Sequence, residues 1–446
     1  MRTAFTLLSL FVVAGAAGAQ SPQQLSLSLG DAARLAAQQS APSLTAELRT
    51  REAEARVQER RADLFPNLST YALESGHTVN SATFGFDFPA PEGEKPLLDP
   101  NGQIIGPVNT LDLRGRVNVP AVDFAARARV SSARTAVRAA EAQARSAADQ
   151  AAATAADAYL RASRADAVVA ARAADSVLAD TLLIIANEQL RAGVGVALDV
   201  TRARAQVAAV HSQLIAARGE QARSRLALVR AIGAPLETSV TLRESLEQIA
   251  TTETPPTESE AVATAMRERA DLVAAQRAVE AGQQAVKAVR AERLPTLGAF
   301  ADDGVIGTSL SHMLNTYAWG VQLSFPVFDG MRRSARTRET QAQTEELVIQ
   351  RRELERQVTV DVRSALVDLA TATEQVTAAR GRLNLAQQEY SQASDRFRAG
   401  VAGNADVVTA ALGLNGARNV LIDALASYQA ARVSLARAEG IATRLP

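Results

Sequence analysis

The sequence contains no cysteine at any of its 446 positions. This absence excludes disulfide bonds, thiol chemistry, cysteine-based metal sites and a lipid-bearing N-terminal cysteine. Histidine is nearly absent as well: His77, His211 and His312 lie in unrelated contexts, unlike the closely spaced clusters that bind metals. We therefore expect no metal site and no cofactor.

An excess of charge of either sign is also missing, because 48 basic side chains balance 48 acidic ones. We expect no nucleic-acid partner, since a surface that binds nucleic acid needs a basic excess. The chain has no P-loop, no Gly-x-Ser-x-Gly and no histidine spacing typical of a metalloenzyme. We expect that the protein is not an enzyme.

Long apolar runs are few, and after the N-terminus none reaches the roughly 20 apolar residues that a membrane-spanning helix needs. Residues 1–19 combine a basic start at Arg2, an apolar run and the small residues Ala17, Gly18 and Ala19. This pattern is typical of a cleaved signal peptide. We expect a secreted chain whose first residue is Gln20.

Glycine and proline are missing from residues 125–192, where Ala, Arg, Glu, Gln and Leu dominate. These helix formers predict a helix over about 122–191, roughly 100 Å long at 1.5 Å per residue. A second long helix is predicted over about 328–398, because residues 331–399 contain no proline and only one glycine, Gly381. Because most apolar side chains are small, we expect a closely packed helical wall rather than solvated spacers. Shorter helices are predicted over about 198–232 and about 405–439.

Most of the sequence is an internal duplication. Arg191-Ala192-Gly193-Val194 returns as Arg398-Ala399-Gly400-Val401, and Asp199-Val200 returns as Asp406-Val407 in the same register. Segments centred on proline recur as well, around Pro66 and Pro295 and around Pro120 and Pro326. The repetition predicts a first copy at 20–234, a second copy at 261–446 and a connecting segment at 235–260. We expect its irregular part, about 250–260, to run outside the helical wall.

Between the helices of each copy the apolar pattern changes to a period of two, which predicts strands. In residues 110–119 Leu and Val alternate with Asp and Arg, and residues 317–325 place Tyr, Trp, Val, Leu and Phe on one face. Each copy should contain one strand hairpin, over about 67–119 and about 296–325. The first hairpin is longer and includes the proline-rich segment 89–96, which we expect at a water-exposed tip.

Of the 17 aromatic residues, 11 lie in or next to these hairpins, within residues 65–124 and 295–328. Together with strand lengths near nine to eleven residues, this favours strands that cross a bilayer, with Tyr317 and Trp319 at the membrane interface. A small soluble sheet packed on helices is the alternative interpretation. Four strands cannot close a barrel and an open edge cannot lie in lipid, so membrane-spanning strands require an oligomer.

The order of these parts resembles the outer membrane efflux protein family, the TolC-like exit ducts. The shared features are a secretory signal and two copies of helix, Leu-Pro-x-Leu (Phe-Pro-x-Leu in the first copy), hairpin, long helix, Gly-Val turn, Asp-Val and a second helix, over about residues 26–441. The resemblance implies a mainly helical fold with a small β part, in which duplicated helical hairpins form an α-barrel tunnel in the periplasm. It implies four strands per chain in a trimeric, twelve-stranded β-barrel in the outer membrane of a Gram-negative-type cell.

The function that the resemblance implies is a passive outer-membrane duct of a tripartite efflux pump or a type I secretion system. The implied partners are two further copies of the chain, a periplasmic adaptor protein, an inner-membrane pump and outer-membrane lipid. The alternative is a periplasmic helical-hairpin adaptor, which is also secreted and rich in Ala and Arg. Such an adaptor would carry one helical hairpin between Gly-rich β modules, without duplicated strands.

The resemblance also implies a periplasmic entrance at the turn after each long helix. Asp406 matches an entrance aspartate, and Asp199 matches an aspartate that latches the closed entrance; helix capping is the alternative role of both. Three copies of Asp406 around a narrow opening would favour cations. Thr409 and Ala402 stand where the family has a second acid and a latching arginine, so we expect the family's latch to be incomplete here.

The two turns themselves match the tips that adaptors grip in the family, although plain helix ends need no partner. The expected docking residues are Arg191, Ala192, Gly193, Val194, Arg398, Ala399, Gly400 and Val401.

Overall fold

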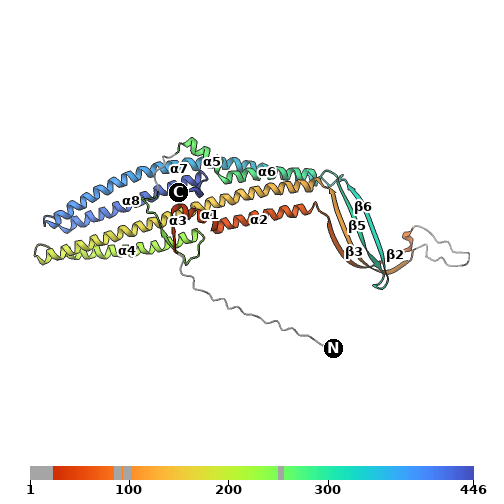
Figure 1. Ribbon diagram of the computed structural model, residues 1–446, viewed down its shortest axis with the longest axis horizontal. Helices are drawn as coiled ribbons and strands as arrows, with labels where there is room; N and C mark the ends of the chain where they lie inside the picture. The colour runs from red at the N-terminus through yellow and green to blue at the C-terminus, as the bar shows by residue number, and fades with distance from the viewer. Residues whose placement is uncertain (1–23, 85–92, 94–101, 250–255) are drawn as a thin grey trace, which may run out of the picture. The chain divides into compact units, whose positions relative to one another are not determined.

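The computed structural model describes residues 24–84, 93, 102–249 and 256–446 (Figure 1). The expected signal peptide at 1–19 lies outside the described residues, as do 250–255 and, apart from Gly93, the proline-rich segment 89–96. The expected class, mainly helical with a small β part, is confirmed. In chain order the elements are β1 (Gln24–Leu27), α1 (Leu29–Gln39), α2 (Ala41–Ala62), β2 (Asn67–Asn80), η1 (Ser81–Phe84), β3 (Ile104–Val122), α3 (Phe124–Arg191), α4 (Ala197–Ala231), β4 (Ser239–Leu242), α5 (Glu258–Glu268), α6 (Ala270–Ala291), β5 (Thr296–Gly307), β6 (Met313–Ser324), α7 (Arg332–Arg398), α8 (Asn404–Ala438) and η2 (Ala442–Arg444).

The four longest helices begin and end within a few residues of the positions that the sequence predicts. α3 and α7 contain 68 and 67 residues, and α4 and α8 contain 35 each. Gly381 does not break α7, because a single glycine costs a helix interior only about 1 kcal/mol. None of the helices in the described ranges combines the length and the apolar character that crossing a membrane requires.

The chain forms two compact units, and α3 and α7 contribute residues to both. The helical unit comprises the described residues of Met1–Thr45, Arg145–Arg269 and Val358–Pro446. The sheet unit comprises the described residues of Ala46–Ala144 and Ala270–Gln357.

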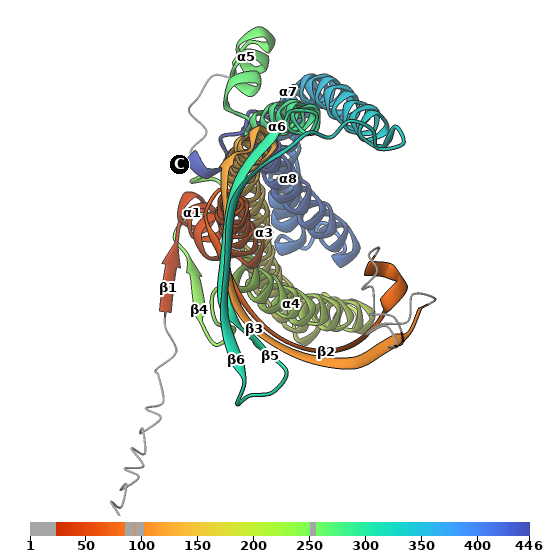
Figure 2. The same ribbon diagram turned by 90° about the vertical axis from the view of Figure 1, so that its right-hand side faces the viewer.

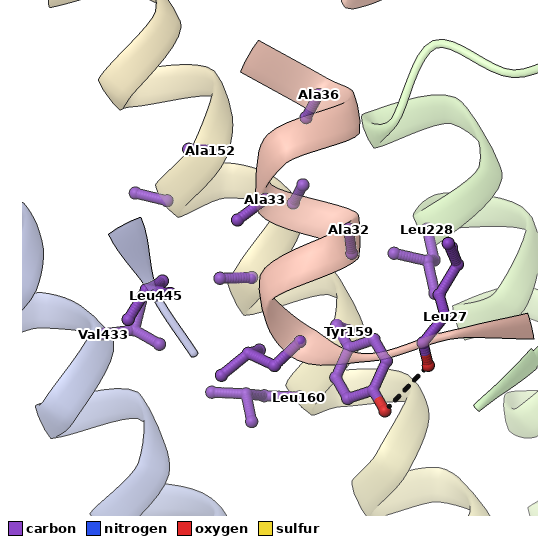
Figure 3. Packing of buried hydrophobic residues seen from close by; sticks show 14 of the residues in the cluster. Leu27, Ala32, Ala33, Ala36, Ala152, Tyr159, Leu160, Leu228, Val433 and Leu445 are labelled. Carbon is purple, nitrogen blue, oxygen red and sulfur yellow. Dashed lines mark hydrogen bonds between the residues drawn. The ribbon is translucent and has the colours of Figure 1, made fainter. Parts of the chain in front are cut away.

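The core of the helical unit is built largely from alanine (Figure 3). Ala32, Ala33 and Ala36 on α1 are fully buried in the same cluster as Ala152 on α3. Because these side chains are short, the two helices can approach closely. Larger side chains complete the core from α4, α8 and the C-terminal segment, among them Leu228, Val433 and Leu445.

Tyr159 on α3 is the largest fully buried side chain of this unit. Its hydroxyl donates a hydrogen bond to the Leu27 carbonyl oxygen (3.3 Å, Figure 3) and accepts one from the Glu244 N–H (3.3 Å). Burial raises the pKa of Tyr159 to about 12, so the phenol stays neutral and can donate. Tyr159 therefore fixes α3 to the end of β1 and to the segment that follows β4.

The segment between the two copies contains structure that the sequence analysis did not predict. β4 pairs with β1 as a parallel two-stranded sheet, with Gln24 opposite Ser239 and Leu27 opposite Leu242. The expectation that residues 250–260 are irregular is wrong for the last three, because α5 begins at Glu258. Thr257 and Glu260 form a capping box there, which satisfies the first free N–H groups of the helix.

β2, β3, β5 and β6 form one antiparallel sheet in that order within the sheet unit (Figures 1 and 2). The first copy supplies the β2–β3 hairpin and the second copy the β5–β6 hairpin, and the two hairpins are joined along β3 and β5. The strands continue beyond the alternating segments, since β2 reaches Asn80, β3 starts at Ile104 and β5 reaches Gly307. Main-chain pairing does not require the side-chain alternation from which the strands were predicted.

The helices of the sheet unit also pack closely. Gly282 on α6 lies against α7, where an added Cβ would be 3.0 Å from Thr344 Oγ1 and 3.3 Å from Leu347 Cδ1. On α3, the Ser132 hydroxyl donates to the Ala281 carbonyl oxygen of α6 (3.2 Å). A side chain at position 282 would therefore require the Thr344 or Leu347 side chain to shift, and glycine avoids this.

Candidate functional site

Two turns, residues 191–196 after α3 and residues 398–403 after α7, are called the tip turns. Gly193 and Gly400 have φ values of 76° and 71°, a conformation that favours glycine. The N–H of Val194 bonds the Gln189 carbonyl oxygen (3.1 Å), and the N–H of Val401 bonds that of Arg396 (3.0 Å). The N–H groups of the two glycines bond the Leu190 and Phe397 carbonyl oxygens, three residues earlier in each case, which completes the Schellman arrangement and ends both helices in the same way.

All eight residues expected at the docking turns are exposed in the structure. The side chains at the two turns include apolar ones that nothing in the described part of the chain covers: Val194 is 77% exposed and Val401 is 68% exposed. Val196 and Leu198 extend this exposed apolar surface beyond the first turn, and the sequence analysis did not single them out.

Asp199 and Asp406 occupy equivalent places in the first turns of α4 and α8, but their surroundings differ. The Asp199 carboxylate is half-buried, with Oδ1 3.7 Å from Arg202 Nη1. Asp406 is exposed and makes no ion pair with any described residue. The cause is in the sequence, because the residue equivalent to Arg202 is Thr409, whose hydroxyl bonds the Ala405 carbonyl oxygen of its own helix (2.8 Å).

Side-chain capping by the two aspartates is not observed. The N-cap residues are Val196 and Gly403, and neither helix has a side-chain hydrogen bond at its cap. Both carboxylates still lie in a first turn, where the helix dipole favours negative charge by about 0.3–1 kcal/mol. Ala402 is half-buried in the second tip turn and carries no polar group.

Two side-chain amides that the sequence analysis missed connect the copies at this end of the helical unit. The Asn404 amide, which is fully buried, donates from Nδ2 to the Asp199 carbonyl oxygen (2.8 Å). The Gln189 amide donates from Nε2 to the Phe397 carbonyl oxygen (2.9 Å). The repeat could have drawn attention to both, because the equivalent residues, Ala197 and Arg396, have no side-chain amide.

A small apolar cluster lies beside these bonds. Leu182 on α3, Phe397 on α7 and Val407 on α8 are buried together, with Ile185 and Tyr390 packed against them. Three helices from both copies therefore meet next to the tip turns.

Further along α3, a buried carboxylate connects α3 to α8. Asp175 is 2% exposed, and its Oδ1 accepts a hydrogen bond from Arg418 Nη1 (2.7 Å) while its Oδ2 accepts one from Arg172 Nη1 (3.2 Å). The Asn415 amide donates to the same carboxylate in its favourable orientation. Burial raises the pKa of Asp175 and prevails over the two guanidinium groups, which lower it. No group of three or more His, Asp or Glu in the described ranges could hold a metal ion.

One face of the sheet is apolar and exposed, and is called the apolar face. The strand pairing places Leu68, Val117, Ala301 and Trp319 in one row across it. Tyr317 and Trp319 are 74% and 76% exposed. The face continues with exposed Val321, Leu323 and Phe325. Glu74 and Asp303 also lie on this face, at equivalent places in the two hairpins, and Asp303 pairs with Tyr317.

The opposite face of the sheet is polar and is called the polar face. Asp302 on β5 is buried between two arginines of β3, with Oδ1 2.7 Å from Arg114 Nη1 and Oδ2 3.2 Å from Arg116 Nη2. Arg114 also bonds Asp112 (3.2 Å) and the Thr316 hydroxyl (3.0 Å). These contacts connect the two hairpins across the β3–β5 joint.

Both sequence comparisons match outer membrane efflux proteins. The family model described as outer membrane efflux protein matches residues 34–234 and 261–440, one range in each copy. The outer membrane efflux protein BepC of Brucella suis biovar 1 (strain 1330) is 26% identical over 276 residues. That match spans 59% of this chain and 59% of the relative, which is less than two thirds of the relative's length.

Solved structures share the fold over nearly the whole chain. The CmeC outer membrane channel of Campylobacter jejuni has a TM-score of 0.75 at 16% identity, covering 93% of this chain and 86% of that one. The open state of the MtrE outer membrane channel of Neisseria gonorrhoeae has a TM-score of 0.74 at 17% identity, covering 93% and 89%. The outer membrane protein VceC of Vibrio cholerae has a TM-score of 0.71 at 20% identity, covering 92% and 96%.

Proposed function

The chain belongs to the outer membrane efflux protein family, and from this premise we propose that three copies form a passive exit duct through the outer membrane. The duct receives substrates from an inner-membrane pump through a periplasmic adaptor and releases them outside the cell. It serves a tripartite efflux pump or a type I secretion system, and the pump selects the cargo.

The observation that carries the proposal is the four-stranded sheet with one exposed apolar face, one polar face and two open edges. An apolar face of this kind suits lipid, and a charged face suits a water-filled lumen. Lipid offers no partner to the unpaired main-chain groups of β2 and β6, so the edges must pair with those of other copies. Three copies of four strands supply a twelve-stranded barrel.

The aromatic and acidic side chains set the depth of the sheet in the bilayer. Tyr317 and Trp319 lie at the interface, where an amphipathic ring has one apolar side and one wet side. Asp303, opposite Tyr317, and the equivalent Glu74 mark the level at which the hydrocarbon ends. Below this level the apolar face continues to Phe325 without a charged side chain on β6.

The helices form the periplasmic tunnel, and the tip turns form its entrance. Three exposed Asp406 carboxylates, one per copy, make the entrance negative and favour cations. Asp199 contributes less because it is half-buried near Arg202. The exposed apolar residues at the tip turns, with Val194 and Val401 at their centres, form the surface that the adaptor grips.

The alternative of an adaptor protein is disfavoured by the family match and by the sheet, which both copies build together. An adaptor has no need of an exposed apolar sheet with open edges. Fractionation separates the two classes: the duct stays in the outer membrane until detergent is added, whereas an adaptor is released by a salt wash.

Conductance in a planar lipid bilayer tests the function itself. Purified protein should insert as units of uniform conductance that prefer cations. A protein that leaves the membrane fraction without detergent and adds no conductance to the bilayer would refute the proposal.

A further inference from the structure

The two hairpins of the sheet have the same strand register, residue for residue. In the first, Leu68 lies opposite Val117 and Tyr71 opposite Arg114. In the second, Leu297 lies opposite Leu323 and Phe300 opposite Gly320.

These pairs are equivalent when counted from the prolines at the hairpin bases. Leu68 and Leu297 each stand two residues after a proline, and Val117 and Leu323 each stand three residues before one. The two copies therefore share their strand pairing as well as their sequence pattern. β2 is equivalent to β5, and β3 is equivalent to β6.

The joint between the hairpins gives a template for a joint between chains. Within the chain β3 pairs with β5, placing Val117 opposite Ala301 and Val119 opposite Ala299. The equivalent strands, β6 and β2, are the two open edges of the sheet. A head-to-tail contact between β6 of one copy and β2 of another uses both open edges and can close a ring under rotation.

We propose that β6 pairs with β2 of a second copy in the β3–β5 register, which places Leu323 opposite Ala72 of the partner subunit. The same register places Phe325 opposite Thr70 of the partner subunit. The inference rests on the proposed barrel and adds to it the residue-level contact that seals it.

The exposed apolar side chains at the base of the sheet agree with this register. The β3–β5 joint contains an irregularity after which Val122 lies opposite Leu297. Its counterpart places Phe328 opposite Leu68 of the partner subunit. Phe328 is 80% exposed and Leu68 is 72% exposed in the single chain, so the joint brings two large exposed apolar side chains together.

The new joint differs from its template on the polar face. The residues equivalent to Arg116 and Asp302 are Gln322 and Leu73, which cannot form an ion pair. The joint between chains is therefore held by main-chain hydrogen bonds and apolar contacts, and its formation is insensitive to salt.

Disulfide trapping tests the register, and the absence of native cysteine makes every cross-link assignable. Leu323→Cys combined with Ala72→Cys should give covalent trimers after mild oxidation, because directly opposite residues have Cβ atoms about 4.5–5.5 Å apart. Two chains carrying Leu323→Cys with Thr70→Cys or with Glu74→Cys shift the pairing by two residues in either direction. They should give several-fold less covalent trimer at both low and high salt.

A further chain with Val117→Cys and Ala301→Cys checks the template, and should form a disulfide within one chain. More covalent trimer from a shifted pair than from the Leu323 and Ala72 pair would overturn the register while leaving the duct intact. A protein that is a monomer in detergent and gives no cross-link between chains with any pair would overturn both the register and the proposed function.

Discussion

At the scale of single residues, Asp406 and Asp199 show how the two copies have diverged. Arg202 lies near Asp199 and no basic side chain takes its place near Asp406, where the repeat has Thr409. Asp406 therefore forms no ion pair with a described residue, and it is the stronger candidate for controlling ion passage.

Asp406→Asn removes that charge with little change in shape. We expect the cation-over-anion permeability ratio of the reconstituted channel to fall roughly threefold to tenfold, because three symmetric charges at a narrow opening focus the potential. Reversal potentials in a salt gradient measure this ratio. Asp199→Asn is the matched control and should change the ratio much less; equal effects of the two variants would remove the special role of Asp406.

Asn404, the first residue of α8, follows the second tip turn and is expected to contribute to the stability of the fold. Asn404→Ala removes the bond to the Asp199 carbonyl oxygen from a fully buried site, so we expect a loss of about 1–3 kcal/mol in the free energy of unfolding. Thermal denaturation followed by circular dichroism measures it. Asn187→Ala removes an amide that bonds only the Leu183 carbonyl oxygen of its own helix and should cost about 0.5 kcal/mol or less. A larger loss for Asn187→Ala than for Asn404→Ala would contradict this assignment.

Glu439, at the end of α8, gives a pH-dependent prediction. Burial raises the pKa of its carboxyl group. A group with a raised pKa in the folded state contributes stability below its unfolded pKa and loses that contribution as the pH rises through its folded pKa. Glu439→Gln should therefore melt at a higher temperature than the parent at pH 7, and the difference should vanish near pH 4.

The control for this prediction has the opposite sign. Arg267 and Arg444 lower the pKa of Glu268 by hydrogen bonding to its carboxylate. Its contribution is present above the unfolded pKa and is lost as the pH falls, so Glu268→Gln should melt at a lower temperature at pH 7. A gain on replacing Glu268, or a loss on replacing Glu439, would show that these surroundings have been assigned wrongly.

At the scale of elements, two ion pairs connect α3 to α8 and differ in burial. Arg418 pairs with the buried Asp175, whereas Arg164 pairs with Asp423 at a site where both side chains are about half exposed. Arg418→Ala leaves a buried carboxylate with fewer partners and should cost about 3–5 kcal/mol. Arg164→Ala should cost about 0–1 kcal/mol. Chemical denaturation in detergent compares the two variants, and equal costs would show that burial does not decide the strength of these contacts.

The elements also show which features a sequence can predict. The C-terminal ends of α3, α4, α7 and α8 were predictable because a glycine, which adopts a positive φ, follows each of them. The β1–β4 pair was not predictable, because two four-residue strands carry too little pattern to show that they meet. Asn404 escaped notice for a related reason: a polar residue next to a turn looks solvated until the packing of α8 buries it.

At the scale of the whole molecule, duplication explains why one chain forms a four-stranded sheet and why that sheet keeps two open edges. Two copies give one joint between hairpins within the chain, and the same geometry leaves one β2 edge and one β6 edge open. The repeat and the apolar face could be inferred from the sequence, and the need for several copies stays a prediction. The polar-face contacts of Asp302 could not, because they depend on the register between strands that are far apart in the chain.

The proposed function requires that lipid-facing strands from several copies close into one barrel. Native mass spectrometry of the detergent-solubilised protein tests it most directly, because it counts the chains in each particle. The account predicts three chains per particle, retained as the detergent is removed in the gas phase. A particle of one chain that stays in solution without detergent would contradict it.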